Sequence, residues 1–122
     1  MANATPAEIE SFFVRCRKLI DSSFVLYKNK PENKLTLIEL GYTYKNVKDE
    51  IRNLSIENYS EGPSPDHHSL DEIWVFGMLI NQREIYIKLQ LSHFNNPGEL
   101  IDTLYCMSFH FADRCLNYPY KK

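Results

Sequence analysis

The sequence lacks a long apolar run and contains few cysteines. No stretch approaches the roughly 18 consecutive apolar residues of a membrane-spanning helix, and the first residues lack the charged and apolar regions of a secretory signal. Cys16, Cys106 and Cys115 form no CxxC pair, which argues against a disulfide framework and a zinc knot. We therefore expect a soluble cytoplasmic protein with reduced thiols and no membrane association.

The sequence also contains few glycines and has a small net charge. With four glycines, the chain has no Gly-rich phosphate loop and no Gly-x-Ser-x-Gly elbow. The formal net charge of −2 does not indicate a strongly basic nucleic-acid binder, although 14 Lys and Arg residues leave room for a local basic patch. A length of 122 residues with 43% apolar residues predicts a single domain, residues 1–122, with a hydrophobic core.

The first half of the chain is predicted to be mostly helical. Thr5, Pro6 and Glu8 have the spacing of a capping box with a first-turn proline. Apolar residues follow at helical spacing, namely Ile9, Phe12, Phe13, Cys16, Leu19 and Ile20. The later predicted elements are a short strand at 24–27, a helix at 35–40 with Asn33 as cap and Gly41 at its end, and a helix at 44–54.

The second half is predicted to form a sheet. Residues 61–68 contain two prolines and are predicted to be a loop. Strands are predicted at 73–80, 83–91 and 104–111, with a tight turn at Asn81 and Gln82 and a loop around 95–98. This order predicts an α+β fold in which N-terminal helices pack on a small antiparallel sheet.

The predicted strands place polar side chains on a common face. In 83–91, Tyr86, Lys88 and Gln90 alternate with aliphatic residues that enter the core. In 104–111, the alternation places Tyr105, Met107, Phe109 and Phe111 on the apolar face and Cys106, Ser108 and His110 on the other. We therefore expect Ser108 and His110 to share an open face with Tyr86 and Lys88.

This set of side chains is suited to acid–base chemistry. Histidine is a common general acid or base, Lys88 can hold a phosphate or an oxyanion, and either Glu61 in the preceding loop or His110 can take a proton. A polar face of an antiparallel strand is usually only solvated, and His110 alone is more often structural. A metal site of Asp66, His67, His68 and His110 is a further alternative, although the spacing of these residues is poor for one.

Five short motifs follow one another in a recognisable order. They are Tyr-Ser-Glu-Gly-Pro at 59–63, Trp-Val-Phe-Gly at 74–77, Ile-Tyr-Ile-Lys at 85–88, Met-Ser-Phe-His at 107–110 and Tyr-Pro-Tyr-Lys at 118–121. In this order and spacing, the chain resembles a divergent branch of the MqsR family of toxins from bacterial type II toxin–antitoxin systems. The resemblance covers nearly the whole chain.

The resemblance implies a RelE-like fold and a metal-independent endoribonuclease without a cofactor. It also implies that the enzyme cleaves mRNA by attack of a ribose 2′-hydroxyl and is held inactive by a cognate antitoxin protein. It does not settle whether the ribosome takes part. The family's catalytic strand tyrosine falls on Tyr86, the lysine two positions later on Lys88, and the basic residue that ends the last strand on His110.

The residues then divide into expected roles. Glu61 or His110 is expected to act as the base and His110 or Tyr86 as the acid. Lys88, alone or together with Arg83, is expected to stabilise the charged phosphorane. Substrate-binding roles are expected for Arg83, Tyr59, Ser108 and Gln90.

Two positions differ from the family pattern and support another reading. The family's catalytic loop lysine aligns near Ser60 and Glu61, and its glutamine after the strand tryptophan is Val75 here. A non-catalytic protein-interaction module that has kept the fold is therefore the main alternative.

Overall fold

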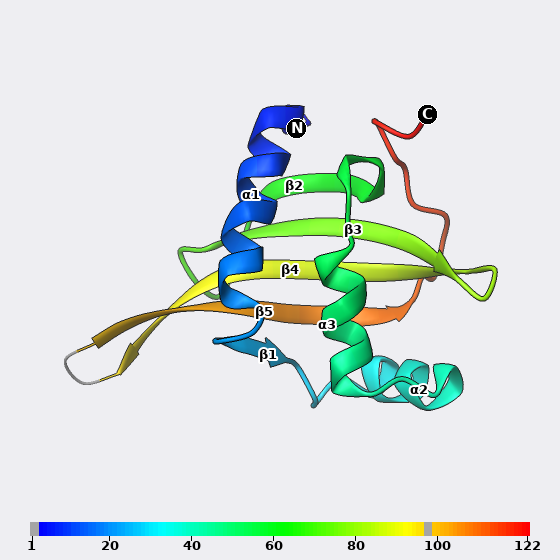
Figure 1. The fold of residues 1–122 in the computed structure, drawn as a ribbon, viewed down its shortest axis with the longest axis horizontal. Coiled ribbons are helices and arrows are strands. Elements are labelled where there is room, and N and C mark those ends of the chain that lie inside the picture. Colours follow the sequence, from blue (N-terminus) through cyan, green and yellow to red (C-terminus); the bar gives the residue numbers. More distant parts are fainter. Residues whose placement is uncertain (1–2, 97–98) are drawn as a thin grey trace.

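The computed structural model describes residues 3–96 and 99–122, and these form an α+β fold (Figure 1). The elements in chain order are α1 (Pro6–Leu19), β1 (Phe24–Leu26), α2 (Pro31–Leu40), α3 (Tyr44–Arg52), the short 3₁₀ helix η1 (Ile56–Asn58), β2 (Tyr59–Pro65), β3 (Glu72–Ile80), β4 (Arg83–Asn96) and β5 (Glu99–Phe111). The predicted fold class is confirmed.

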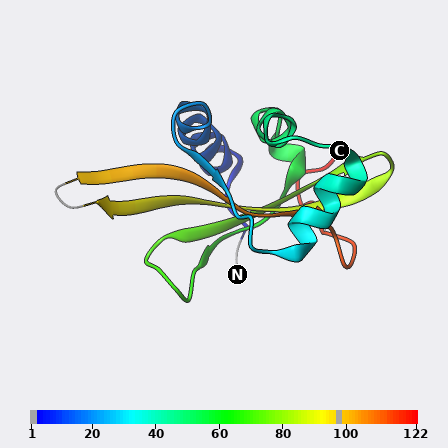
Figure 2. The same cartoon turned by 90° about the horizontal axis from the view of Figure 1, so that it is seen from below.

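The strands form one sheet in the order β1-β5-β4-β3-β2. The strands β3, β4 and β5 pair in antiparallel fashion, as predicted, and β2 adds to β3 in the same way. Strand β1 pairs with β5 in parallel, so the sheet is mixed. Helices α1 and α3 cover one face, and α2 lies beside the edge formed by β1 and β5 (Figure 2). We call the face that is turned away from α1 and α3 the open face.

Helix α1 begins and packs as predicted. The Thr5 hydroxyl accepts a hydrogen bond from the Glu8 amide, and the Glu8 carboxylate accepts one from the Thr5 amide, which completes the capping box. The apolar stripe is buried against the sheet, and the ring of Phe12 stacks on Trp74 with centroids 4.4 Å apart. These contacts build one side of a single core cluster.

Helix α2 begins earlier than predicted and uses Asn33 differently. It starts at Pro31 with Lys30 as the N-cap, because proline is preorganised for the first helical position. The prediction that Asn33 caps the helix is wrong, since Asn33 lies inside it and is buried. Gly41 ends the helix in a left-handed conformation, with φ of 67°, as predicted.

The side chain of Asn33 completes the edge of β5 beyond the end of β1. Its amide nitrogen donates to the carbonyl of Met107 (3.3 Å), and its oxygen accepts from the amide of Phe109 (3.0 Å). The hydroxyl of Thr36 accepts a hydrogen bond from the amide of Phe111 (3.1 Å), which lies two residues further along the same edge of β5. Side chains of α2 therefore satisfy backbone groups that would otherwise need another strand.

A β-bulge at Met107 changes the alternation of β5. Lys88 pairs with Ser108, but the next residue of β4, Leu89, pairs with Cys106, so that Met107 is the extra residue. The prediction that Cys106 lies on the polar face is wrong: Cys106 is buried in the core, and Tyr105 lies opposite Gln90 on the open face. A regular alternation cannot hold on both sides of a bulge.

Several boundaries also differ from the sequence prediction. Residues 59–65 form strand β2 where a loop was predicted from residue 61, because irregular pairing with β3 accommodates the prolines. The turn at Asn81 and Gln82 is confirmed, with φ of 51° and 66°. Strands β4 and β5 extend to Asn96 and from Glu99, and residues 97–98 of the predicted loop lie outside the described residues.

The C-terminal segment crosses the open face above β3. Gly77 leaves room for it, because a Cβ there would lie 2.3 Å from the Tyr118 hydroxyl and 2.5 Å from Leu116 Cδ1. All three cysteines are free, two of them buried and Cys115 exposed. Among residues 3–96 and 99–122, no helix has both the length and the apolar character needed to cross a bilayer.

We predict that Asn33→Ala lowers the free energy of unfolding by about 2 kcal/mol or more, because it leaves buried backbone groups of β5 unpaired. Asn29→Ala, in the exposed loop before α2, is the matched control and should change stability by less than about 0.5 kcal/mol. Urea unfolding of both variants tests this, and equal midpoints would show that the Asn33 bridge does not stabilise the fold.

Candidate active site on the open sheet face

Two cross-strand pairs form the centre of the candidate site. Tyr86 lies opposite His110, and Lys88 lies opposite Ser108, on neighbouring strands β4 and β5. The rings of Tyr86 and His110 stack, with centroids 5.4 Å apart and planes inclined by 18°. The predicted placement of these four residues on one face is confirmed, and the bulge at Met107 precedes the two residues from β5.

The hydrogen bond of His110 fixes which ring nitrogen is free. Its Nδ1 lies 3.0 Å from the carbonyl oxygen of Phe111. Because a carbonyl oxygen only accepts, Nδ1 carries the proton of this bond. In the neutral ring, Nε2 is then the unprotonated nitrogen, which is the one able to accept a proton from a ligand.

Two lysines converge beside Ser108. The Nζ of Lys30 donates to the Ser108 hydroxyl at 2.7 Å, and Ser108 is completely buried. Burial lowers the pKa of Lys88, the nearby charge of Lys30 lowers it further, and the Asp66 carboxylate opposes this. Two ammonium groups held this close repel each other, so the pair is suited to bind an anion such as phosphate.

Tyr86 lies near two further charged side chains, those of Glu61 and Arg114. Its burial and the nearby charge of Glu61 raise the pKa of Tyr86, and Arg114 opposes this shift. The phenol therefore remains protonated near neutral pH and can act as a hydrogen-bond donor. Glu61 and Lys88 lie on opposite sides of Val75 in the sheet register, so a carboxylate and a cation flank one buried apolar residue.

A polar cavity adjoins Tyr86. It has a volume of about 560 Å³ and lies between β2, β4 and the segment that follows β5. Its lining includes Glu61, Tyr86 and Arg114 together with the small polar residues Asn3, Ser60 and Asn117. The cavity thus offers both hydrogen-bond donors and acceptors next to the stacked pair.

Two residues predicted to bind substrate lie outside this group. Tyr59 is completely buried under the helices, where its hydroxyl accepts from the amide of Ala4 and donates to the carbonyl of Gly62. Arg83 forms an ion pair with Glu39 of α2 (2.6 Å), and its guanidinium lies 3.5 Å from the ring centroid of Phe111. Neither side chain is placed to contact a ligand on the open face.

Gln90 has a supporting position. It is buried, and its amide donates to the carboxylate of Asp66 (2.8 Å) while its oxygen accepts from Ser92 (2.8 Å). Gln90 therefore ties the connection between β2 and β3 to the sheet. The substrate-binding role of Gln90 stays a prediction.

Sequence reasoning missed Lys30 and Arg114. Lys30 precedes α2 and is 78 positions from Ser108, and Arg114 follows the last strand. Both reach the open face only because α2 and the C-terminal segment fold back against the sheet. The Lys30–Pro31 sequence does mark a helix start, which is the only local signal that places Lys30 at a helix end.

The residues of the metal alternative do not converge. Within residues 3–92 and 102–122, whose side chains the structure describes, no three His, Cys, Asp or Glu side chains form a group that could hold a metal ion. The carboxylate of Asp66 instead accepts from the amide of His68, the hydroxyl of Ser69 and the amide of Gln90. These bonds, led by that of the His68 amide, lower the pKa of Asp66.

Comparison with known proteins adds no assignment: no protein family, curated protein or solved structure matches the chain.

We predict that Lys88→Met raises the free energy of unfolding at pH 7, by less than about 1 kcal/mol because Lys88 is partly exposed. The folded state lowers the pKa of Lys88, so its protonated form destabilises the fold below that pKa. The gain should shrink as the pH rises towards the unfolded value near 10.5.

The matched control is Lys45→Met, which removes an exposed ammonium paired with Asp49 and should be nearly neutral. Urea unfolding of wild type and both variants at pH 7 and at higher pH provides the test. A loss of stability in Lys88→Met would show that Lys88 serves the fold and not a ligand.

Proposed function

We propose that the chain is a cytoplasmic ribonuclease toxin of the MqsR type, which cleaves mRNA on the open face of the sheet. One observation carries the proposal: the stacked Tyr86 and His110 lie beside the converging ammonium groups of Lys30 and Lys88. The resemblance in sequence motifs supports the same activity independently. Arg114 adds a third cation to this face, although the net charge of the chain is −2.

The proposed reaction is an intramolecular transesterification. The ribose 2′-oxygen forms a bond to the adjacent phosphorus while the bond from phosphorus to the 5′-oxygen breaks. His110 Nε2 takes the proton from the 2′-hydroxyl, and the Tyr86 hydroxyl gives a proton to the leaving 5′-oxygen. Lys30 and Lys88 stabilise the charge that develops on the phosphorane.

The polar cavity beside Tyr86 is proposed to hold a nucleotide base next to the scissile phosphate. Bases of single-stranded RNA are read by hydrogen bonds to their edges and by stacking on aromatic rings. Arg114 and the amide side chains can donate to a base, and Glu61 can accept from it. In this arrangement Glu61 binds substrate, and His110 alone is the base.

In cells, a cognate antitoxin is the proposed partner that holds the toxin inactive. Induced expression of the chain alone in a bacterial host should then stop growth within minutes and deplete mRNA. Normal growth with intact RNA would favour the alternative, an interaction module without catalysis.

We predict that the purified chain cleaves single-stranded RNA in the presence of EDTA and leaves 2′,3′-cyclic phosphate and 5′-hydroxyl ends. Removal of a general acid–base group costs about 100-fold or more in rate, so His110→Ala and Lys88→Ala should lose most activity. End-labelled RNA on denaturing gels measures both the rate and the product ends. Wild-type rates in both variants would refute this site.

The matched control is Arg83→Ala. It also removes a cation from β4, but Arg83 contacts Glu39 and Phe111 and does not face the site. It should retain cleavage close to the wild-type rate, provided that circular dichroism shows an intact fold. Loss of cleavage in folded Arg83→Ala would show that RNA reaches another part of the sheet.

Glu61→Gln decides between the two candidate bases. If His110 is the base, Glu61→Gln should alter the preferred cleavage sequence and change the rate constant by less than about tenfold. The measurement is single-turnover cleavage of RNAs that differ at one base. A loss as large as that of His110→Ala, without a change of sequence preference, would assign the base to Glu61.

A further inference from the structure

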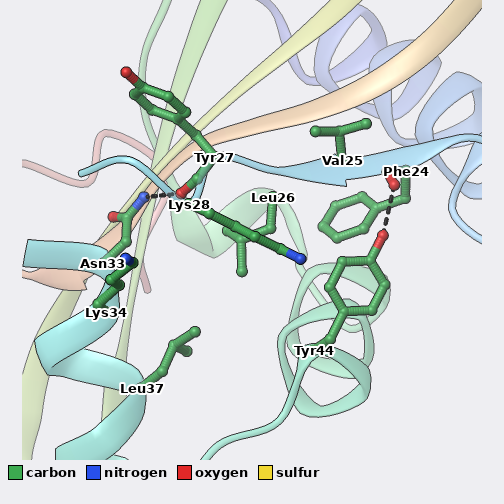
Figure 3. Close-up of a pocket in the computed structure, with 9 residues that line it drawn as sticks. All are labelled: Phe24, Val25, Leu26, Tyr27, Lys28, Asn33, Lys34, Leu37 and Tyr44. Carbon is green, nitrogen blue, oxygen red and sulfur yellow. Dashed lines mark hydrogen bonds between the residues drawn. The ribbon is translucent and has the colours of Figure 1, made fainter. Parts of the chain in front are cut away.

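A second cavity lies where β1 meets α2 and α3 (Figure 3), and it shares no lining residue with the polar cavity beside Tyr86. Its volume of about 630 Å³ is in the range of ligand-binding pockets. Its lining is apolar and includes Phe24, Leu26, Leu37 and Tyr44. None of the residues assigned to catalysis lines it, so the cavity needs a separate explanation.

The cavity runs along an open sheet edge. Strand β1 ends the sheet, and no described strand lies beyond it. The Ser23 carbonyl accepts from Leu104, and the Tyr27 amide donates to Cys106, so alternate residues of β1 direct their backbone groups towards β5. The backbone amide and carbonyl of Leu26 consequently point away from β5, towards the place of a sixth strand.

This edge is rich in exposed apolar side chains. Eight large apolar side chains are exposed in the described residues, and five of them lie between residues 25 and 44. These five are Val25, Tyr27, Leu35, Ile38 and Tyr44. Three of the five, Val25, Tyr27 and Tyr44, are lining residues of the cavity, and exposed apolar side chains that lie together are typical of an interaction site.

Two lysines line the same cavity and have no ion-pair partner among the described residues. Lys28 extends across the cavity towards Tyr44, and Lys34 lies on the α2 side (Figure 3). By contrast, Lys48 of α3 is already paired with Asp21. The Tyr44 hydroxyl already donates to the outward carbonyl of Phe24, so the outward backbone groups of β1 that remain open are those of Leu26. The cavity thus combines an apolar floor, these two backbone groups and two positive charges without an ion-pair partner in the described part of the chain.

We propose that this edge binds an extended acidic peptide segment of a partner protein, which adds to β1 as a further strand. Apolar side chains of the peptide would fill the cavity, and its carboxylates would pair with Lys28 and Lys34. The peptide backbone would pair with the amide and carbonyl of Leu26, because the Tyr44 hydroxyl already occupies the carbonyl of Phe24. The proposal does not depend on the ribonuclease activity.

The charges favour this occupant over two others. In a second copy of the chain paired through the same edge, the lysines would face lysines and repel each other. A nucleic acid would satisfy the two ammonium groups but not the apolar floor or the backbone groups of Leu26. An acidic peptide with apolar residues satisfies all three features.

The test is selection of displayed random 12-residue peptides on the purified full-length chain. We expect enriched peptides in which acidic and aliphatic residues alternate. Their affinity, measured by fluorescence anisotropy, should fall about tenfold or more in Lys28→Glu/Lys34→Glu. It should persist in the control Lys18→Glu/Lys122→Glu, which makes the same change of charge outside the cavity. Hydrogen exchange of the Leu26 amide should slow when peptide binds.

Three results would overturn the proposal. They are the absence of an acidic and aliphatic consensus, equal affinity of the two double variants, and unchanged exchange at Leu26 in the complex. The edge would belong to a second copy of the chain if the chain dimerises and Lys28→Glu/Lys34→Glu alone loses the dimer. It would belong to RNA if the chain binds polyuridylate and only that variant loses the binding.

Discussion

The candidate site depends on the β-bulge at Met107. Before the bulge, Leu104 and Cys106 face the core, and after it Phe109 and Phe111 do so, which turns Ser108 and His110 to the open face. Without the extra residue, the polar side chains of one half of β5 would enter the core. Asn33 holds the carbonyl of Met107 and the amide of Phe109 on either side of the bulge, and the same helix places Lys30 against Ser108. The start of α2 therefore stabilises the edge of β5 and also positions a lysine of the candidate site.

The electrostatics of the open face oppose the stability of the fold. Lys30 and Lys88 repel each other, and burial makes the charge of Lys88 more costly. The pKa of Tyr86 is raised by burial and by Glu61, so a protonated phenol stands next to the ring of His110. Arrangements of this kind are typical of functional sites, because a ligand supplies the missing opposite charge when it binds. A phosphate bound between Lys30 and Lys88 would offset the repulsion between their two positive charges.

Local patterns predicted most of the fold, and long-range contacts determined the rest. The capping box at Thr5, the turn at Asn81 and Gln82 and the alternation of β4 are local, and the structure confirms them. The prediction that Asn33 caps α2 failed because the sequence does not show that this side chain bonds to β5, 74 to 76 positions away. Tyr86, Lys88, Ser108 and His110 could be placed on one face, whereas Lys30 and Arg114 reach it through tertiary packing. The sequence does not show that Arg83 contacts Glu39 and Phe111 or that Tyr59 contacts Ala4, so it could not place these two side chains away from the other predicted site residues.

The measurement that tests the central claim most directly is the site of RNA binding on the folded protein. A short RNA with 2′-O-methyl groups cannot undergo the proposed attack, and it can be titrated into isotope-labelled protein and followed by nuclear magnetic resonance. We expect the largest shifts at the His110 ring and at the amides of residues 86–88 and 108–110, with small shifts in α1 and α3. Shifts confined to the helical face, or none at RNA concentrations in the millimolar range, would contradict the assignment of the open face as a ribonuclease site.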